Sequence, residues 1–266
     1  MPFVEFVGTP GSGKSTLMAA VVAQLRKKRG DLFLTADDAL FDAARHGIDP
    51  VFKIPLTLLP RPVAKAFFTK IGNRSYWQLD GQGRFLAKND RIFRDILDSE
   101  PFRSLSLAEK EIVLSGFQQA GGAYECIRQC STQEQYIFFD EGLLQKSMMF
   151  VAPHAAIRDA AALNRYLAAV PLPDIAVVLD LDQKRCRERM RGRSKGLIRR
   201  LQGDSPDAIE AFLNNAVRHW QSIVDWLENE SATRVVTLSS AARIEMTTTA
   251  VVDYILKDGG FGRDGK

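Results

Sequence analysis

The chain has 266 residues, of which 45% are hydrophobic and 26% are charged, as in an ordinary globular protein with a substantial core. This composition excludes a chain that is disordered, collagen-like or coiled-coil as a whole. No apolar run approaches the roughly 20 residues that a membrane-spanning helix needs. Three cysteines are too few for a disulfide framework, so we expect reduced thiols and a cytoplasmic protein.

Positive charge is concentrated in one segment of the chain. The 36 basic and 32 acidic residues give a net charge of +4, but residues 183–200 hold nine basic residues and one acidic residue. The rest of the chain has 27 basic and 31 acidic residues. A compact positive field suits a polyphosphate better than a long nucleic-acid track, so we do not expect a nucleic-acid partner. The alternative is a solvated basic helix.

Five short apolar runs, separated by stretches of helical periodicity, predict a buried parallel sheet. They occupy residues 3–7, 32–35, 136–139, 175–181 and 234–238. Such a pattern indicates a three-layer α/β fold with a central parallel sheet of about five strands.

Helical periodicity fills much of the remaining chain. It predicts helices at 17–25, 84–97, 105–129 with an interruption at Gly121-Gly122, 205–227, and about 241–256. Ser205 and Pro206 suit the start of the fourth helix, whose apolar face we assign to the core. We treat residues 1–258 as one domain. Its core is 1–40 and 134–256, its helical acceptor-side insertion between the second and third strands is about 41–133, and 259–266 is a flexible tail.

The first apolar run leads into GTPGSGKST at residues 8–16, which matches the phosphate-binding pattern G-x-x-x-x-G-K-[ST]. Glycines let backbone N–H groups approach phosphate oxygens, and the next helix presents its positive end there. We expect Lys14 to contact the β- and γ-phosphates of ATP and Ser15 to bind Mg²⁺. The residues expected to bind nucleotide are Gly8, Pro10, Gly11, Ser12, Gly13, Lys14, Ser15 and Thr16. Since the motif begins at residue 8, we expect no cleavable leader.

Acidic residues follow two of the other predicted strands. Asp140 ends the third strand and precedes Glu141, while Asp37 and Asp38 follow the second strand. The carboxyl ends of parallel strands face the ligand crevice. Asp140 is therefore a candidate to hold Mg²⁺ or to accept a proton, and Asp37 or Asp38 to bind or deprotonate an acceptor. The alternatives are a strand-ending cap and a helix cap.

Arginines follow the fourth predicted strand. Asp182 and Gly192 bracket a short helix, and Arg189, Arg191 and Arg193 lie at and after its end. Arginine stabilises the charge that develops on the equatorial oxygens during phosphoryl transfer. We therefore expect these side chains to close over a bound nucleotide.

Together these features resemble the P-loop nucleoside and nucleotide kinases, with thymidylate kinase the nearest general pattern. The resemblance covers about residues 1–40 and 134–256 and includes VVLDLDQKRCRERMRGR at 177–193. It implies transfer of the γ-phosphate of Mg²⁺–ATP to a hydroxyl or phosphate of a small-molecule acceptor, either a nucleoside, a nucleotide or a sugar. It also implies that Arg189 lies against the adenine and that Arg193 reaches the transferred phosphoryl. The basic residue that the family has after its acid is missing at Glu141, which leaves the acceptor open.

Two other functions fit parts of the sequence. LSGFQQ at 114–119 and YIFFDEG at 136–142 are similar to motifs of transporter-type ATPases, which would make the chain an ATP-driven switch without a phosphorylated product. Only seven residues precede Gly8, however, and Phe117 stands where a second glycine is expected. A polynucleotide 5′-hydroxyl kinase is the other alternative.

The predicted insertion contains an amphipathic basic stretch at residues 51–74. Such a stretch can make a weak contact with an anionic membrane surface, or it can pack on the protein's own core. The sequence is also compatible with a homodimer.

Overall fold

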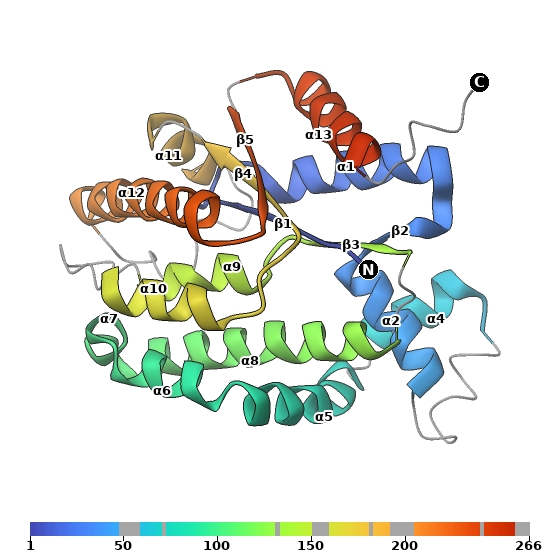
Figure 1. Cartoon of the computed structure of the whole chain (residues 1–266), viewed down its shortest axis with the longest axis horizontal. Helices are drawn as coiled ribbons and strands as arrows, with labels where there is room; N and C mark the ends of the chain where they lie inside the picture. Colours follow the sequence, from blue (N-terminus) through green and yellow to red (C-terminus); the bar gives the residue numbers. More distant parts are fainter. Residues whose placement is uncertain are drawn as a thin grey trace.

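The computed structural model describes residues 1–47, 59–70, 73–130, 134–150, 160–180, 183–191, 205–239 and 242–258. Its centre is a five-stranded, fully parallel sheet of order β2-β3-β1-β4-β5 (Figure 1). The strands are β1 (Phe3–Gly8), β2 (Phe33–Thr35), β3 (Tyr136–Phe139), β4 (Ile175–Asp180) and β5 (Arg234–Ser239). The three-layer α/β fold predicted from the sequence is confirmed, and each strand lies within two residues of its predicted bounds.

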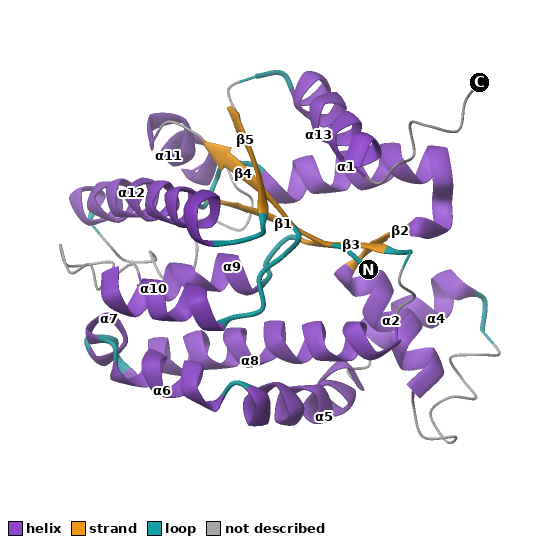
Figure 2. Cartoon of the chain, viewed as in Figure 1, coloured by secondary structure: helices purple, strands orange, loops and turns teal. Residues whose placement is uncertain are grey.

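Helices surround the sheet and fill the long connection between β2 and β3 (Figure 2). They are α1 (Lys14–Arg29), α2 (Ala36–Gly47), α4 (Arg61–Lys70), α5 (Asn73–Lys88), α6 (Asp90–Asp98), α7 (Glu100–Arg103), α8 (Leu107–Cys130), α9 (Leu143–Lys146), α10 (Ala160–Ala169), α11 (Gln183–Arg191), α12 (Pro206–Glu230) and α13 (Ile244–Asp258). No helix in these ranges is long and apolar enough to cross a membrane.

The alternation of side chains along the strands builds the two outer layers. Val4 and Phe6 of β1 point to the face covered by α1 and α13, where they pack in one apolar cluster. Val7 points to the opposite face and packs with residues of α8, α9, α10 and α12. Figure 1 shows the same division, with α1 and α13 above the sheet and the larger helical layer below it. Strands β1, β3 and most of β4 are therefore buried on both faces, as the continuous apolar runs predict, whereas the edge strand β5 is only partly buried.

The position of β1 determines where a ligand can bind. It lies between β3, with Glu5 paired to Phe139, and β4, with Gly8 paired to Leu179. The chain leaves β1 toward one edge of the sheet and later returns to the other side of it. Ligands of open α/β sheets bind outside the carboxyl ends of the strands at such a switch point.

Two helix predictions were wrong. The predicted helix 84–97 falls in two helices, α5 and α6, which meet at Asn89. The side-chain amide of Asn89 donates to the Phe85 carbonyl. The predicted interruption at Gly121-Gly122 is absent, because both glycines lie inside the continuous helix α8. They serve a packing purpose: a Cβ on Gly121 would lie 2.2 Å from the Phe85 ring. The glycines mark the close approach of α5 to α8 and not a break.

Other sequence expectations agree with the described residues or lie outside them. Helix α12 begins after Ser205, whose hydroxyl accepts from the Ala208 N–H, and its apolar face is buried in the core as predicted. The last helix begins at Ile244, three residues later than expected. All three cysteines are free thiols. The flexible tail predicted at 259–266 lies outside the described residues.

The amphipathic basic stretch at 51–74 is described only in part. In α4, Lys65 forms an ion pair with Asp38, and Arg61 forms an ion pair with Asp42 at 2.7 Å. Phe68 is buried against Phe41 of α2. These contacts show the described portion packing on α2.

Candidate active site

The loop between β1 and α1 has the shape of a phosphate-binding loop. Gly8, Gly11 and Gly13 adopt positive φ angles of 146°, 89° and 97°, which favour glycine. A Cβ on Gly8 would also lie 2.6 Å from the Leu179 carbonyl oxygen of β4. The Lys14 Nζ donates to the Gly8 carbonyl at 3.0 Å, so the lysine folds back over the loop. Lys14 and Ser15 begin α1, and the N-terminus of a helix favours an anion through its first backbone N–H groups and its dipole.

Arg189 reaches this loop from the other half of the chain. Its Nη1 donates to the Ser12 carbonyl at 3.1 Å, although 177 residues separate the two in sequence. Arg187 of the same helix forms an ion pair with Glu210 of α12 at 2.8 Å, which ties α11 to the core. The side chain of Arg191 is not described, and Arg193, Asp182 and Gly192 lie outside the described residues. The closure of all three arginines over a nucleotide therefore stays a prediction.

Asp140 follows the last residue of β3 and so lies at the edge of the sheet that carries the loop. Its Oδ1 is buried and has no hydrogen-bond partner among the described residues. A buried carboxylate oxygen without a donor is costly unless a ligand or ion supplies one. The next residue, Glu141, is exposed and pairs with Lys146 at 3.0 Å.

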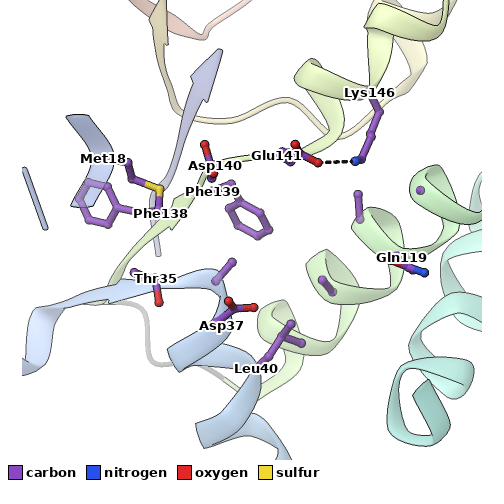
Figure 3. Close-up of a pocket in the computed structure, with 14 residues that line it drawn as sticks. Met18, Thr35, Asp37, Leu40, Gln119, Phe138, Phe139, Asp140, Glu141 and Lys146 are labelled. Carbon is purple, nitrogen blue, oxygen red and sulfur yellow. Dashed lines mark hydrogen bonds and ion pairs between the residues drawn. The ribbon is translucent and has the colours of Figure 1, made fainter. Parts of the chain in front are cut away.

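A cavity of about 290 Å³ opens beside Asp140 (Figure 3). Its apolar walls are Met18 of α1, Phe138 and Phe139 of β3, Leu40 of α2, and three alanines. Its polar lining residues are Thr35, Asp37, Gln119, Asp140, Glu141 and Lys146. Met18 is one helical turn beyond Lys14, so the cavity adjoins the phosphate-binding loop. Helices α2 and α8, at the ends of the predicted insertion, form its far side.

The structure separates the two neighbouring aspartates of α2. Asp37 lines the cavity. Asp38 is buried and accepts from Arg26 at 2.5 Å, Thr35 at 2.6 Å and Lys65. Burial alone raises the pKa of Asp38, but the hydrogen bonds from these donors outweigh it and hold the pKa well below its ordinary value. Asp38 therefore anchors α1, α2 and α4 together, and Asp37 is the aspartate of this pair that lines the cavity.

A second buried acid, Glu5 of β1, was not predicted from the sequence. Its carboxylate accepts from the backbone N–H of Leu144 at 3.1 Å and of Gln145 at 2.7 Å, at the start of α9. Burial raises the pKa of Glu5 to about 7, although these hydrogen bonds act to lower it. Position 142 requires glycine, since a Cβ there would lie 2.5 Å from the Glu5 carboxyl group. The sequence signal that could have indicated this residue is a single charged side chain within an otherwise apolar strand.

Helix α9 joins the loop and the cavity through successive residues. The Gln145 side-chain oxygen accepts from the Gly8 backbone N–H at 3.2 Å, at the first residue of the phosphate-binding loop. Lys146 lines the cavity. Neither residue was predicted from the sequence, because nothing in the local pattern of residues 143–146 distinguishes this short helix from an ordinary connection. Only the folded chain brings it under the loop.

The transporter-type alternative loses its main support. LSGFQQ lies in the middle of α8, where backbone N–H groups are used within the helix. Phe117 is buried in the core and packs edge-to-face on Phe85 and Phe93. Such a segment has no free backbone donors for a γ-phosphate.

The parallel sheet, the glycine loop and the helix that follows it define a P-loop fold of the α/β class. No family model matches the chain, and no curated protein matches it. Among solved structures, the chain is similar to a deoxyadenosine kinase from M. mycoides with the products dCMP and a flexible dCDP bound. The identity is 14%, the TM-score is 0.46, and the match covers 96% of this chain and 99% of the other. A structure of the deoxyadenosine kinase from M. mycoides with bound dCTP matches at 14% identity with a TM-score of 0.44, over the same shares of both chains.

Likeness of this size assigns neither a family nor a substrate, and the function of the chain is inferred from the residues of its site. The narrower likeness to thymidylate kinase stays a prediction.

Proposed function

We propose that this protein is a Mg²⁺–ATP-dependent phosphotransferase of the P-loop kinase type. It would transfer the γ-phosphoryl group to a hydroxyl or phosphate of a small-molecule acceptor, such as a nucleoside, nucleotide or sugar. One observation carries the proposal: the cavity of about 290 Å³ is lined by Asp140 at the end of β3 and by Met18, one helical turn beyond Lys14, so it adjoins the phosphate-binding loop. A simple ATP-driven switch needs no second cavity beside its phosphate site, whereas a kinase must hold an acceptor there.

The loop and the basic residues would bind the nucleotide. The backbone N–H groups of residues 8–16 and Lys14 would hold the β- and γ-phosphates. Arg189 already contacts this loop, and Arg191 and Arg193 follow it in the chain. Arginine at the transferred group lowers the barrier electrostatically, with an effect on the rate of about 10³- to 10⁵-fold in related chemistry.

The residues of the site fit a magnesium ion. Asp140 offers a buried carboxylate oxygen without a partner among the described residues, and Ser15 offers a hydroxyl in the first turn of α1. Hard oxygen donors of this kind are those that Mg²⁺ prefers. Asp140 and Ser15 would hold the ion, which neutralises phosphate charge when bound.

Two carboxylates face the acceptor from different elements. Asp140 comes from the end of β3 and Asp37 from the first turn of α2. In this proposal Asp140 accepts the hydroxyl proton or organises the metal, and Asp37 orients the acceptor or takes the proton. A well-placed general base contributes about 10²- to 10⁴-fold to a rate. The cavity walls from α2 and α8 would limit water near the phosphoryl group, so hydrolysis without acceptor should be slow.

The first test is the release of ADP from Mg²⁺–ATP, measured with and without acceptors for wild type and Lys14→Ala. We expect acceptor-stimulated turnover that falls by at least 10²-fold in Lys14→Ala, because the lysine contacts the phosphates. The control is Lys27→Ala, an exposed lysine in the last turn of the same helix, which should leave turnover unchanged. Steady hydrolysis that no acceptor changes would contradict the proposal and favour the switch.

A further inference from the structure

The phosphate-binding loop begins where β1 extends beyond the neighbouring strand β3. Strand β3 ends at Phe139, which pairs with Glu5, whereas β1 continues to Gly8. No residue of the described β3 pairs with Gly8 on this side of the sheet. The buried N–H of Gly8 donates instead to the side-chain oxygen of Gln145, at 3.2 Å. One side chain of α9 therefore satisfies the backbone at the first residue of the loop, where a strand would otherwise do so.

The backbone of Gly8 connects this side chain to Lys14. The Gly8 carbonyl accepts from the Lys14 Nζ at 3.0 Å. Gly8 is thus bonded through its N–H to Gln145 and through its carbonyl to Lys14. Gly8 also packs closely on β4, since a Cβ there would lie 2.6 Å from the Leu179 carbonyl oxygen. A displacement of Gln145 would therefore reach Lys14 through a single residue.

Helix α9 is too short to hold Gln145 in place by itself. It spans four residues, and an isolated turn of helix is unstable in water. Side chains of other elements hold its first residues. The buried Glu5 carboxyl group of β1 accepts from the backbone N–H groups of Leu144 and Gln145. The buried Tyr166 hydroxyl of α10 donates to the Leu143 carbonyl at 2.6 Å.

Helix α12 holds the other end of α9. The buried Ser147 hydroxyl donates to the Leu144 carbonyl at 2.5 Å and lies 3.0 Å from the His219 Nε2. Since the one hydroxyl hydrogen of Ser147 goes to Leu144, the Nε2–H of His219 is the donor in the second contact. All of these contacts join protein groups, so they position α9 whether or not a nucleotide is bound.

From these contacts we infer that Gln145 is a positioning residue of the phosphate-binding loop. It holds Gly8, and through Gly8 the side chain of Lys14, in the geometry that receives the β- and γ-phosphates. This inference rests on the proposed function, because it names the residue that orders the same site. Gln145 is not among the residues that line the cavity, so it acts through Gly8 and not on the acceptor. A loop that is ordered in advance binds more tightly, because binding does not have to order it.

Binding of a nucleotide tests the inference without turnover. Calorimetric titration with Mg²⁺ and a non-hydrolysable ATP analogue compares wild type with Gln145→Leu, which removes the accepting oxygen and keeps a side chain of similar size. We expect the dissociation constant for the analogue to rise at least tenfold, because binding must then order the loop as well. Gln129→Leu makes the same change on an exposed residue in the last turn of α8 and should leave the constant within twofold of wild type.

Amide hydrogen exchange tests the contact itself. In Gln145→Leu the Gly8 N–H loses its acceptor and should exchange at least tenfold faster than in wild type. The N–H of Phe6, in the same strand, should keep its wild-type rate, because a general loss of stability would speed exchange throughout β1. Gln145→Glu keeps an accepting oxygen at the same reach, so exchange at Gly8 should stay slow in this variant.

Four results would overturn the inference. They are an unchanged dissociation constant in Gln145→Leu, an unchanged exchange rate at Gly8, equal acceleration at Gly8 and Phe6, and fast exchange at Gly8 in Gln145→Glu. A wild type that binds the analogue but phosphorylates no acceptor would contradict the proposed function and leave the inference standing. A wild type that does not bind the analogue would overturn both.

Discussion

The buried surroundings of Glu5 determine the pKa of its carboxyl group. It is 3% exposed, in the middle of the central strand, and its carboxylate is held by two backbone N–H groups of α9. Desolvation nevertheless raises the pKa of Glu5 to about 7. In the unfolded chain the same carboxyl titrates near pH 4.3. The folded protein therefore keeps a proton over a range of pH in which the unfolded chain has lost it.

This difference predicts how stability depends on pH. Between about pH 4.3 and pH 7 the folded state binds more protons, so the free energy of unfolding falls as pH rises. Glu5 contributes roughly 3 kcal/mol to the free energy of unfolding. This contribution is fully present below the pKa of the unfolded chain and is lost as the pH rises through the pKa of the folded protein. Urea titrations at pH 5 and pH 8 should show a larger decrease for wild type than for Glu5→Gln.

The control is Glu228→Gln, which changes an exposed glutamate of α12. We expect the two free energies of this variant to follow those of wild type. If Glu5→Gln and wild type lost the same free energy between pH 5 and pH 8, Glu5 would not titrate as argued.

At the scale of elements, the contact between α5 and α8 depends on glycine. Gly121 lies in the interior of α8, and a Cβ there would meet the Phe85 ring at 2.2 Å. Gly83 lies in α5, and a Cβ there would meet no atom of another described element within 4 Å. Both glycines lie inside an α-helix, but only Gly121 packs closely against another helix. The two positions therefore make a matched pair.

Alanine at the two positions should have opposite effects on stability. Alanine gains up to about 1 kcal/mol of helix propensity over glycine, while overpacking costs about 1–3 kcal/mol. Gly121→Ala should therefore lower the free energy of unfolding by roughly 1–2 kcal/mol, and Gly83→Ala should raise it by up to about 1 kcal/mol. Chemical denaturation measures both. Stabilisation by Gly121→Ala would show that α5 does not approach α8 so closely.

Helix α9 is an element whose importance exceeds its length. Its start is held by Glu5, its Gln145 side chain accepts from Gly8, and its Lys146 lines the cavity. The Tyr166 hydroxyl donates to the Leu143 carbonyl at 2.6 Å, which ties α9 to α10 as well. A shift of this one turn would move the phosphate-binding loop and the cavity wall together.

At the scale of the molecule, nucleotide binding should couple α11 to the loop. Arg189 of α11 connects the two elements, because its side chain donates to the Ser12 carbonyl of the loop. A nucleotide analogue at 100 times its dissociation constant should stabilise wild type by about 2.7 kcal/mol. A tenfold weaker affinity in Arg189→Ala would reduce this gain to about 1.4 kcal/mol at the same concentration. Thermal unfolding with and without Mg²⁺ and the analogue measures the difference.

Arg185→Ala is the matched control, since Arg185 is exposed on the same helix. It should keep the full stabilisation by the nucleotide analogue. Equal stabilisation of Arg189→Ala and wild type would show that Arg189 does not contribute to nucleotide binding.

The sequence alone determined the parts of this protein whose chemistry is local. A strand that is apolar at every position must be covered on both faces of its sheet. Five such runs therefore predicted the five-stranded parallel sheet. The spacing of glycines before Lys14 and Ser15 determines the backbone conformation of this loop, so its shape could be predicted as well. The rule that the carboxyl ends of parallel strands share one edge of the sheet placed Asp140 at the same edge as the pair Asp37 and Asp38.

Only the tertiary structure decided the features that depend on distant neighbours. Asp37 and Asp38 are adjacent and chemically identical, and the choice between them depends on Arg26 and Lys65, which α1 and α4 bring to Asp38. The glycine pair of α8 resembles a helix break until Phe85 is placed against Gly121. Glu5 and Gln145 gain their roles by contacts across more than 130 residues of sequence. Long-range contacts leave no periodic trace in the sequence, because each partner's local pattern fits an ordinary strand or helix.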